Sequence, residues 1–487
     1  MLMPLQPVHD SPVRTRHPFL LRAIRRRKHP PLRRTDITVT DEKSVKRAVK
    51  AAALGNAMEW FDFGIYSYLA VTIGKVFFPP GNDNAQILSS FATFAAAFLV
   101  RPLGGMFFGP LGDRIGRKKV LSLTMIMMAS STLAIGLVPG YASIGFWAPV
   151  LLIASRMLQG FSTGGEYGGA STFIAEYSPD KRRGFFGSFL EFGTLIGYTT
   201  AAGLVTVLTV ALPHSAMQSW GWRVPFLVAA PIGLIGLYLR LKLDETPAFQ
   251  KLADDDGSAA DTASHAGFLQ RMRGQWRAMV LCVALVAAFN ITDYMLLSYM
   301  PTYLSNTLGY GTTSALVSII VVMLVLMAAI TFVGRFSDRI GRKPVLMAGS
   351  LGFLVLAVPS FLLIRHGTTA TVFAGLLLLG LCLLPYVSVM SASLPALFPT
   401  QVRYGSLSIA FNISVSLFGG TTPLVIEALI GGFHDDLVPA YYTMAAAVVG
   451  VVATAAMKES ARKPLKGSPP SVATKDEAID LVESQHA

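Results

Sequence analysis

The sequence Gly-Pro-Leu-Gly-Asp-Arg-Ile-Gly-Arg-Lys occupies residues 109–118, and its core, Asp-Arg-Ile-Gly-Arg-Lys, returns at residues 338–343. Each copy lies between two long apolar stretches, so each predicts a tight reversal between two helices. Glycine permits such a reversal because it has no Cβ. The Asp can meet a basic residue or a helix N-terminus. A bridge of this kind would hold a gate closed until the two parts of the protein move.

The alternative is a solvated turn without a gating role, since exposed ion pairs are weak. The repetition of the motif at matching places favours the gate. The residues expected to form it are Gly109, Asp113, Arg114, Gly116 and Arg117 in the first copy, and Asp338, Arg339, Gly341 and Arg342 in the second.

Apolar segments of roughly twenty residues recur on both sides of the two motifs, and about twenty helical residues cross the hydrocarbon core of a bilayer. The sequence therefore predicts an all-α integral membrane protein with twelve transmembrane helices in two pseudo-symmetric six-helix halves. Repeated halves with a solute site near the midplane are a recurrent transporter architecture. The predicted spans are residues 55–78, 86–111, 119–139, 147–175, 185–212, 222–241, 276–304, 313–336, 343–364, 369–396, 404–432 and 437–457.

The remaining segments complete the predicted domain organisation. It consists of a basic cytoplasmic tail at 1–54, a first half at 55–241, a cytoplasmic linker at 242–275, a second half at 276–457 and a cytoplasmic tail at 458–487. The Arg-rich N-terminal tail could either touch anionic lipid headgroups or stay solvated and disordered.

Charge in the loops predicts the orientation of the chain. Loops near residues 114–119, 181–183 and 339–343 carry Lys and Arg, whereas the alternate loops at 79–85, 139–146, 213–220 and 305–312 carry none. By the positive-inside rule the charged loops are cytoplasmic. We therefore expect both termini in the cytoplasm of a bacterium and the helices in its inner membrane.

Composition excludes several other classes of protein. The chain is 52% hydrophobic and 14% charged, whereas about 25% of residues are charged in soluble proteins. Its net charge of +13 fits basic loops beside a membrane better than nucleic-acid binding. Cys282 and Cys382 lie in apolar runs and are expected to be buried thiols. Without a nucleophile–base motif or a metal-ligand set, the sequence predicts no enzyme, no cofactor and no metal.

Ionisable side chains inside the predicted spans are expensive to bury and are therefore functional candidates. Glu59 and Asp62 share one face of the first helix. Two nearby carboxyl groups resist joint ionisation, so we expect one of them to carry a proton, and Asp62, which lies deeper, is the better carrier. For each acid alone, a structural ion pair is an equal alternative. The residues expected to couple transport to protons are Asp62, Glu59, Arg156, Glu166 and Glu191.

Four stretches carry a resemblance to a known family. They are residues 109–119, Arg-Met-Leu-Gln-Gly-Phe-Ser-Thr-Gly-Gly at 156–165, Gly-Asn-Ala-Met-Glu-Trp-Phe-Asp-Phe-Gly-Ile-Tyr at 55–66 and Gly-Gly-Glu-Tyr-Gly-Gly-Ala at 164–170. Together they resemble the metabolite:proton symporter family of the major facilitator superfamily. That resemblance implies alternating access by two rocking halves, with Arg156 in proton coupling. Shorter strings at 244–250, 299–304 and 411–415 are similar to the symporters of proline and glycine betaine.

The same resemblance implies that the first and seventh helices face the solute. Aromatic faces there would attract an ammonium head group by cation–π interaction, and an Arg would bind a carboxylate. Ordinary aromatic packing or an interfacial belt is the alternative for each ring. The expected solute-binding residues are Trp60, Tyr66, Arg101, Asp293, Tyr294 and Tyr299. Asp293 stands where those symporters would carry a neutral aromatic residue.

The sequence thus predicts a proton-driven symporter of small zwitterionic osmolytes that works as a monomer with solute, protons and membrane lipid as partners. A symporter of organic acids such as 2-oxoglutarate, citrate or shikimate is the nearest alternative; it would need more basic and fewer aromatic residues in the cavity. A solute-binding osmosensor without transport is a third alternative. The tail from Leu465 onward shows no sustained heptads, so no C-terminal coiled coil is expected.

Overall fold

The computed structural model describes residues 37–115, 117–241 and 273–484, without the side chains of residues 109–110, 112–119, 121 and 235–241. These parts of the chain form a bundle of long helices. Helices recur because a buried backbone without water must satisfy its own hydrogen bonds. The first half contains α2 (Glu42–Tyr68), α3 (Ala70–Phe77), α4 (Asp83–Leu99), α5 (Arg101–Ile115), α6 (Arg117–Leu137), α7 (Tyr141–Ile144), α8 (Trp147–Thr163), α9 (Glu166–Tyr177), η2 (Asp180–Arg182), α10 (Arg183–Ala211), α11 (His214–Ala216), η3 (Met217–Gly221) and α12 (Arg223–Leu241).

The second half repeats this pattern with more interruptions. Its helices α15 and α20 each run into π-helical turns, which tend to occur at functional sites. The elements are α15 (Trp276–Asp293), η4 (Tyr294–Tyr299), α16 (Met300–Thr302), η5 (Tyr303–Thr307), α17 (Thr312–Ile340), α18 (Arg342–Arg365), α19 (Thr369–Ser393), η6 (Pro395–Leu397), α20 (Arg403–Ser414), η7 (Val415–Gly419), α21 (Thr422–Phe433), α22 (Val438–Ala456) and α23 (Lys475–Glu483).

Each of the twelve predicted spans coincides with one of these helices or with a run of two to four consecutive helical elements. Eight segments in the described part of the chain are long and apolar enough to cross a membrane by composition alone. The first helix is longer than predicted, because α2 begins at Glu42, where Asp41 caps it by accepting hydrogen bonds from the backbone N–H groups of Lys43 and Ser44.

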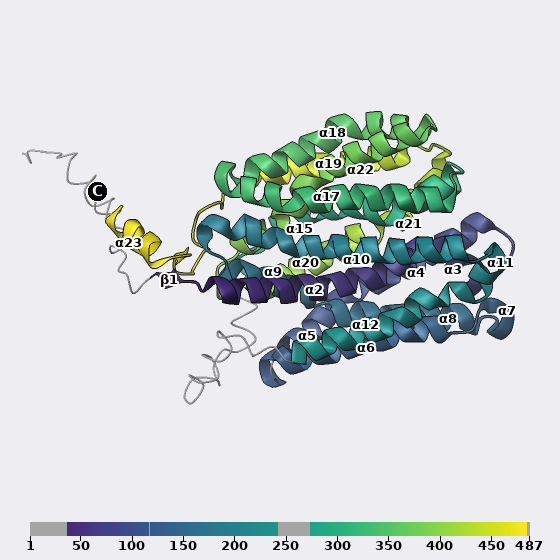
Figure 1. Cartoon of the computed structure of the whole chain (residues 1–487), viewed down its shortest axis with the longest axis horizontal. Coiled ribbons are helices and arrows are strands. Elements are labelled where there is room, and N and C mark those ends of the chain that lie inside the picture. The colour runs from purple at the N-terminus through teal and green to yellow at the C-terminus, as the bar shows by residue number, and fades with distance from the viewer. Residues whose placement is uncertain (1–36, 116, 242–272, 485–487) are drawn as a thin grey trace, which may run out of the picture.

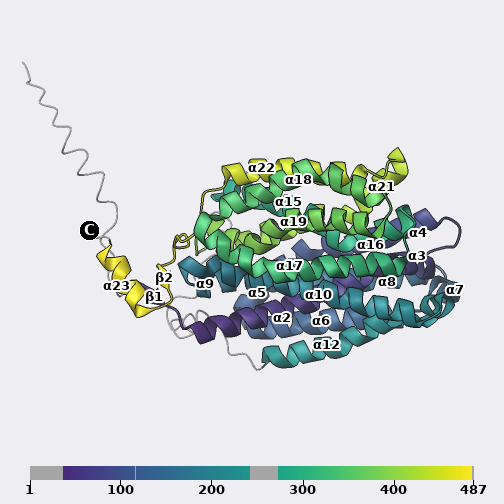
Figure 2. The same ribbon diagram turned by 45° about the horizontal axis from the view of Figure 1, so that its top comes forward.

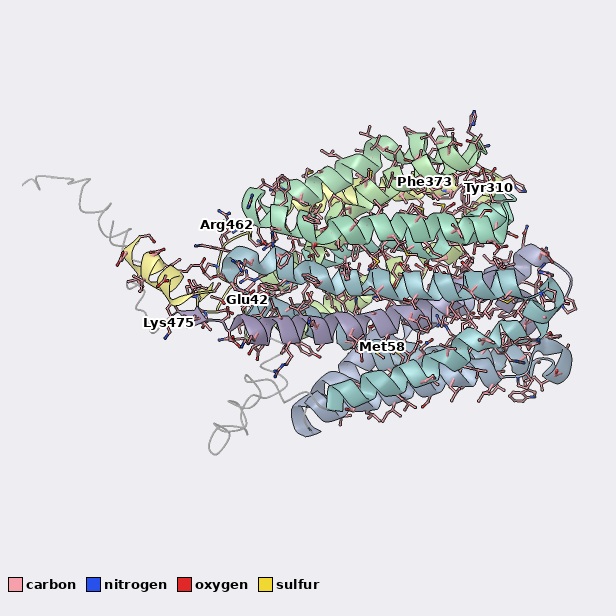
Figure 3. All side chains as sticks on the ribbon, viewed as in Figure 1. Glu42, Met58, Tyr310, Phe373, Arg462 and Lys475 are labelled. Carbon is pink, nitrogen blue, oxygen red and sulfur yellow. The ribbon has the colours of Figure 1, made fainter. Side chains whose placement is uncertain are left out.

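The two halves lie against each other as two groups of helices (Figures 1 and 2). In both views α17, α18, α19 and α22 form one side, and α2, α6 and α12 the other, while α10 lies beside α17. Figure 3 places Glu42, Arg462 and Lys475 at one end of the bundle and Tyr310 toward the opposite end. We call the end formed by Glu42, Asp180, Asp338 and Glu459 the terminal face, because the described chain begins and ends there, and the opposite end the distal face.

Glycines allow the helices to approach closely. A Cβ at Gly193 or Gly197 of α10 would lie 2.2 Å from Ala53 O or 2.3 Å from Ala57 O of α2. A Cβ at Gly160 of α8 would lie 1.7 Å from Ala97 O of α4. These helix pairs therefore depend on the absence of a side chain.

The repeated motif lies at corresponding places in the two halves, as predicted. The first copy joins α5 to α6, which are separated by residue 116 alone, and the second joins α17 to α18 through Gly341. Gly341 has φ +111°, a conformation that a residue with a Cβ rarely adopts. The predicted role of glycine in the reversal is thus confirmed for the second copy.

At the terminal face the two ends of the described chain meet. The short strand β1 (Thr38–Val39) pairs in parallel with β2 (Ser471–Val472). Ile37, Val472 and Ala478 form a small apolar cluster there, separate from the core of the bundle.

Candidate solute and proton site

A chain of buried hydrogen bonds links Asp62 to Arg156 inside the first half. Thr132 Oγ1 on α6 donates to Asp62 Oδ2 at 2.8 Å, and Gln159 Nε2 on α8 donates to Thr132 Oγ1 at 2.8 Å. Arg156 Nη1 donates to Gln159 Oε1 at 2.5 Å. All four side chains are at most 5% exposed. A carboxyl group and a guanidinium group are thereby connected without touching each other.

Glu59 points to a different partner from Asp62, although the two lie on neighbouring turns of α2. Arg101 Nη2, at the start of α5, lies 2.7 Å from Glu59 Oε1, and both side chains are at most 2% exposed. Removing either partner of such a buried pair would leave an uncompensated charge, at a cost of about 3–5 kcal/mol.

Both buried arginines retain unused hydrogen-bonding capacity. Within the described residues, Nε and Nη1 of Arg101 and Nε and Nη2 of Arg156 have no hydrogen-bond partner. The Arg156 guanidinium lies over the ring of Tyr66 at 4.1 Å, and that of Arg101 lies 5.4 Å from the ring of Phe98. Buried N–H groups without an acceptor are costly, so these two groups are suited to bind an anion such as a carboxylate.

Aromatic rings from both halves meet beside the arginines. The ring centroid of Tyr294 in η4 lies 5.6 Å from that of Trp60 and 5.4 Å from that of Phe98. The ring of Tyr198 on α10 lies 5.3 Å from that of Trp60. Asn56 Oδ1 accepts a hydrogen bond from the Trp60 indole N–H at 3.2 Å and fixes its orientation. We call Trp60, Phe98, Tyr198 and Tyr294 the aromatic cluster.

Two further carboxyl groups lie near Tyr294 of this cluster. Glu191 on α10 accepts hydrogen bonds from Tyr167 OH at 2.6 Å and from Thr194 Oγ1 at 2.8 Å. Asp293 directly precedes Tyr294, is 2% exposed, and has no partner for Oδ1 within the described residues. The Asp293 carboxyl is close enough to that of Glu191 for the two to interact electrostatically. The first half thus supplies two cations, and the two halves together supply these two carboxyl groups, around Tyr294.

Three predicted site residues lie elsewhere in hydrogen-bonded positions. Tyr66 donates to Ser90 O at 3.0 Å, and Tyr299 donates to Glu427 Oε2 at 2.6 Å. Glu166, at the start of α9, accepts from Thr124 Oγ1 at 3.2 Å. None of these three hydrogen bonds reaches the aromatic cluster or the Asp62 network, although the ring of Tyr66 lies beneath the Arg156 guanidinium.

The second copy of the gating motif makes a direct contact between the halves. Asp338 Oδ1 and Oδ2 accept hydrogen bonds from the backbone N–H groups of Gly184 at 2.8 Å and Phe185 at 2.9 Å, which begin α10 in the first half. Arg342 Nη2 donates to Asp338 Oδ1 at 3.0 Å. A carboxylate at a helix N-terminus is stabilised by the unpaired N–H groups there. The side chains of Asp113, Arg114 and Arg117, and residue 116, lie outside the described residues.

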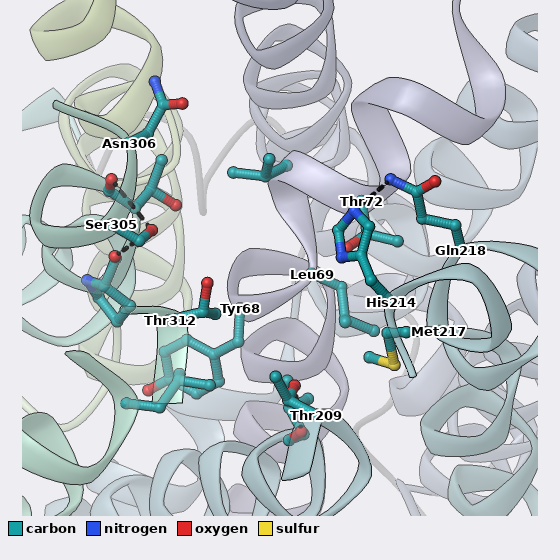
Figure 4. Close-up of a pocket in the computed structure, with 15 residues that line it drawn as sticks. Tyr68, Leu69, Thr72, Thr209, His214, Met217, Gln218, Ser305, Asn306 and Thr312 are labelled. Atoms are coloured by element: carbon teal, nitrogen blue, oxygen red, sulfur yellow. Dashed lines mark hydrogen bonds between the residues drawn. The ribbon is translucent and has the colours of Figure 1, made fainter. Parts of the chain in front are cut away.

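A pocket of about 170 Å³ opens toward the distal face between the halves (Figure 4). It lies between the end of α2, the end of α10 and the segment Pro301–Asn306. His214 and Gln218 lie on one wall, where their Nε2 atoms are 2.9 Å apart. Polar groups therefore line the space between the halves on that side.

Comparison with known proteins agrees with this architecture. The family described as "Sugar (and other) transporter" matches residues 48–266 and 251–470. The glycine betaine/proline/ectoine/pipecolic acid transporter OusA of Dickeya dadantii is 46% identical over 467 residues, which cover 95% of this chain and 93% of that protein. The proline/betaine transporter of Salmonella typhimurium is 45% identical, covering 94% of this chain and 92% of that protein.

A solved structure shares the fold. The proton:xylose symporter XylE of the major facilitator superfamily, bound to 6-bromo-6-deoxy-D-glucose, superposes with a TM-score of 0.66 at 19% identity, over 86% of this chain and 97% of XylE. The chain belongs to the major facilitator superfamily. The resemblance read from its motifs and the predicted two-half, all-helical membrane fold are thereby confirmed. This member of the superfamily is a multi-pass membrane transporter.

Several residues of the site were not predicted from the sequence, namely Thr132, Gln159, Asn56, Tyr167 and Tyr198. Gln159 lies within the quoted stretch at 156–165, and Asn56 within the stretch at 55–66. A polar residue in an apolar span was the available signal, but it applies equally to serines and threonines that bond only to their own helix, such as Ser130 and Thr206.

Proposed function

We propose that this transporter is a proton-driven symporter of small zwitterionic osmolytes, such as proline or glycine betaine, in a bacterial inner membrane, and that it has no enzymatic activity. The observation that carries the proposal is the convergence of guanidinium and carboxyl groups on the aromatic cluster. Arg101 and Arg156 retain unpartnered N–H groups within the described residues, and the carboxyl groups of Asp293 and Glu191 lie near Tyr294. The names of the relatives at 45–46% identity support the same solute class.

A zwitterion would lie across this site with its carboxylate toward Arg101 or Arg156. Its ammonium group would lie against Trp60 and Tyr294, whose faces replace part of the water lost on binding. Asp293 and Glu191 would complete the anionic side. An organic dianion would instead meet carboxyl groups at one end of the site, and their repulsion disfavours the organic-acid alternative.

Asp62 is the proposed proton carrier, and Arg156 and Gln159 belong to the hydrogen-bond network around its carboxyl group. Protonation of a carboxyl inside the membrane removes a charge that is costly to bury, so proton binding and release would change the energy of the closed bundle. The proposed gate is the Asp338 contact to the start of α10, on the face that the loop charges assign to the cytoplasm together with both termini.

Uptake into membrane vesicles tests the proposal. Labelled glycine betaine, proline and 2-oxoglutarate are supplied with and without an imposed proton gradient, and solute counterflow is measured without a gradient. We expect gradient-driven accumulation of betaine and proline but not of 2-oxoglutarate. Accumulation of 2-oxoglutarate alone would establish the organic-acid alternative, and binding without counterflow would establish a receptor.

The variant Asp62→Asn should abolish gradient-driven accumulation while leaving counterflow intact, because it removes the proton but not the solute site. Asp83→Asn is the matched control, since Asp83 is an exposed carboxylate paired with Lys75 at the distal face. Normal accumulation by Asp62→Asn would remove Asp62 from the mechanism.

A further inference from the structure

We infer that Thr132 is a positioning residue whose hydroxyl group adapts to the protonation state of Asp62. Gln159, which is itself bonded to Arg156, holds this hydroxyl group in place. This inference rests on the proposed role of Asp62. Thr132 is 0% exposed and lies on α6, a helix that carries none of the solute-binding or proton-coupling residues expected from the sequence.

The direction of each hydrogen bond follows from the chemistry of the donors. A guanidinium group only donates, so the side of Gln159 that faces Arg156 must be the amide oxygen. The amide nitrogen then faces Thr132 and donates to its oxygen. The Thr132 hydroxyl oxygen therefore always accepts a hydrogen bond from Gln159, and the single hydroxyl hydrogen is free to donate to another acceptor.

Two acceptors lie within reach of that hydrogen. Asp62 Oδ2 is 2.8 Å from Thr132 Oγ1, and Met128 O is 3.0 Å away. An ionised Asp62 is the stronger acceptor and takes the hydrogen. A protonated Asp62 can donate to the second lone pair of the Thr132 oxygen, and the hydroxyl hydrogen then turns to Met128 O. The Thr132 hydroxyl group therefore keeps its hydrogen bonds in both states.

The charged groups around Asp62 do not replace this function. Arg156 on α8 and Glu59 on α2 act on Asp62 through space, Arg101 on α5 is bonded to Glu59, and Glu191 on α10 is bonded to Tyr167 and Thr194. Uncharged groups contact the carboxyl directly: Thr132 donates to Asp62 Oδ2, and the Gln159 amide also interacts with it.

The test compares Thr132→Val, which keeps the shape but removes the hydroxyl, with Thr132→Ser, which keeps the hydroxyl. Loss of a donor to a carboxylate disfavours its charged form. The pH at which proton-driven uptake of proline falls to half should therefore rise by about one to two pH units in Thr132→Val. Thr132→Ser should keep the wild-type pH profile, and counterflow should persist in both.

An unchanged pH profile in Thr132→Val, in a protein whose Asp62→Asn variant has lost accumulation, would refute the role of Thr132 while the proposed function stands. Normal accumulation by Asp62→Asn would instead refute the proposed proton site itself. Should Thr132→Val not fold, a wild-type profile in Thr132→Ala would equally overturn the inference.

A second inference rests on different contacts. We propose that residues 458–483, here called the C-terminal strap, tie the two halves together at the terminal face and must leave the first half when that face opens. The proposal depends on alternating access. Figure 1 shows α23 at the end of the bundle where α2 begins.

The strap is anchored first to the second half. Glu459 Oε1 accepts from the backbone N–H of Arg342 at 3.0 Å and Oε2 from that of Lys343 at 3.0 Å. Burial alone would raise the pKa of the Glu459 carboxyl, but the backbone N–H groups of Arg342, Ala461, Lys343 and Ser460 outweigh this and hold it below its ordinary value.

Two equivalent arginines, one in each half, bind the strap. Arg183 Nε donates to the carbonyl eight residues before it, Ala175 O at 3.0 Å, and Arg403 Nε does the same to Pro395 O at 3.1 Å. Each also donates to a strap carbonyl: Arg183 to Lys463 O at 3.1 Å and Arg403 to Lys466 O at 2.9 Å. Both arginines are at most 2% exposed.

The strap ends on the first half. The backbone N–H of Ser471 donates to Asp180 Oδ2 at 3.0 Å, and β2 pairs with β1, which precedes α2. Because the strap continues the chain from α22 of the second half, residues 458–471 bridge the contact between the halves, covalently joined to the second half and hydrogen-bonded to the first.

A reversible cross-link tests this bridge. Thr38 and Ser471 are direct partners in the β1–β2 pair, so Thr38→Cys with Ser471→Cys should form a disulfide on oxidation. In a background with Cys282 and Cys382 replaced by Ala, oxidation should lower proline uptake at least tenfold and reduction should restore it, whereas either single cysteine should have no effect. Wild-type uptake by the cross-linked protein would refute the proposal, and so would failure of the disulfide to form in the folded protein.

Discussion

Replacing Asp338 by Asn should open the terminal face more often, because this carboxylate bonds the two halves directly. Its oxygens accept from the first N–H groups of α10 at 2.8 and 2.9 Å, and the side chain is 4% exposed. The contact to Arg342 lies within one half and persists when the face opens. Only the two bonds to α10 therefore enter the difference between the closed and open states.

The magnitude follows from what asparagine can retain. Its oxygen can still accept one of the two N–H groups, but its NH₂ group cannot accept the other, and the charge at the helix N-terminus is lost. The loss of one charge-assisted hydrogen bond is worth about 1.5–3 kcal/mol. The population of the open state should then rise about 10- to 150-fold.

Cysteine labelling measures this population. Ser171 Oγ on α9 donates to Ser391 O on α19 at 2.9 Å, so Ser171 lies on a buried contact between the halves. In inside-out membrane vesicles and the cysteine-free background, Ser171→Cys should react with a membrane-impermeant maleimide only when the terminal face opens. The rate should rise about 10- to 150-fold with Asp338→Asn, provided that the closed state still predominates.

Asp476→Asn is the matched control, because Asp476 is an exposed carboxylate on α23 of the same face. It removes the same charge without touching α10 and should leave the labelling rate unchanged. Equal labelling rates in Asp338→Asn and the parent would refute the gate, and an increase of the same size in Asp476→Asn would show that net charge, and not the contact, controls opening.

Three further results are expected. Gly197→Ala should destabilise the protein by about 1–3 kcal/mol, because its Cβ would lie 2.3 Å from Ala57 O, whereas a Cβ at Gly203 meets nothing within 4 Å; equal melting temperatures of Gly197→Ala and Gly203→Ala would contradict the packing. Trp60→Leu should weaken betaine binding about tenfold and Trp60→Phe much less, since only an aromatic face attracts the ammonium group; equal loss in both would exclude that attraction. The hydrogen bonds of ionised Glu459 stabilise the strap at pH values above the ordinary carboxyl pKa, and they should be lost as the pH falls through the lowered pKa of the folded protein. Amide hydrogen exchange of residues 459–471, corrected for its intrinsic pH dependence, should therefore rise on acidification of the wild type. In Glu459→Gln the exchange should be high at all pH values.

The sequence was sufficient for the spans and for the duplication because both depend on local patterns. Apolar length predicted the helices, and the repeated Asp-Arg-Ile-Gly-Arg-Lys predicted two equivalent reversals. It also identified Asp62, Arg101, Arg156, Glu191 and Asp293 as costly charges, all of which are buried.

The partners of those charges could not be predicted, because they depend on how each helix is rotated toward its neighbours. Glu59 and Asp62 share a face of α2, yet one bonds to α5 and the other to α6. Gln159 gives no sign in the sequence that it separates Arg156 from Thr132. Helix rotation also determines that Tyr66 and Tyr299 form hydrogen bonds outside the aromatic cluster.

The two arginines that hold the strap each bind a main-chain oxygen of it, at Lys463 and Lys466. Any residue that preserves the local backbone conformation presents the same carbonyl group at positions 463 and 466. The tail can therefore change its composition over evolutionary time without losing this attachment. Alignments of related transporters would score such a segment as variable, and a designer who removed it as dispensable would take one main-chain acceptor from each of two buried arginines. A low level of similarity in a tail is therefore a poor guide to whether it can be deleted.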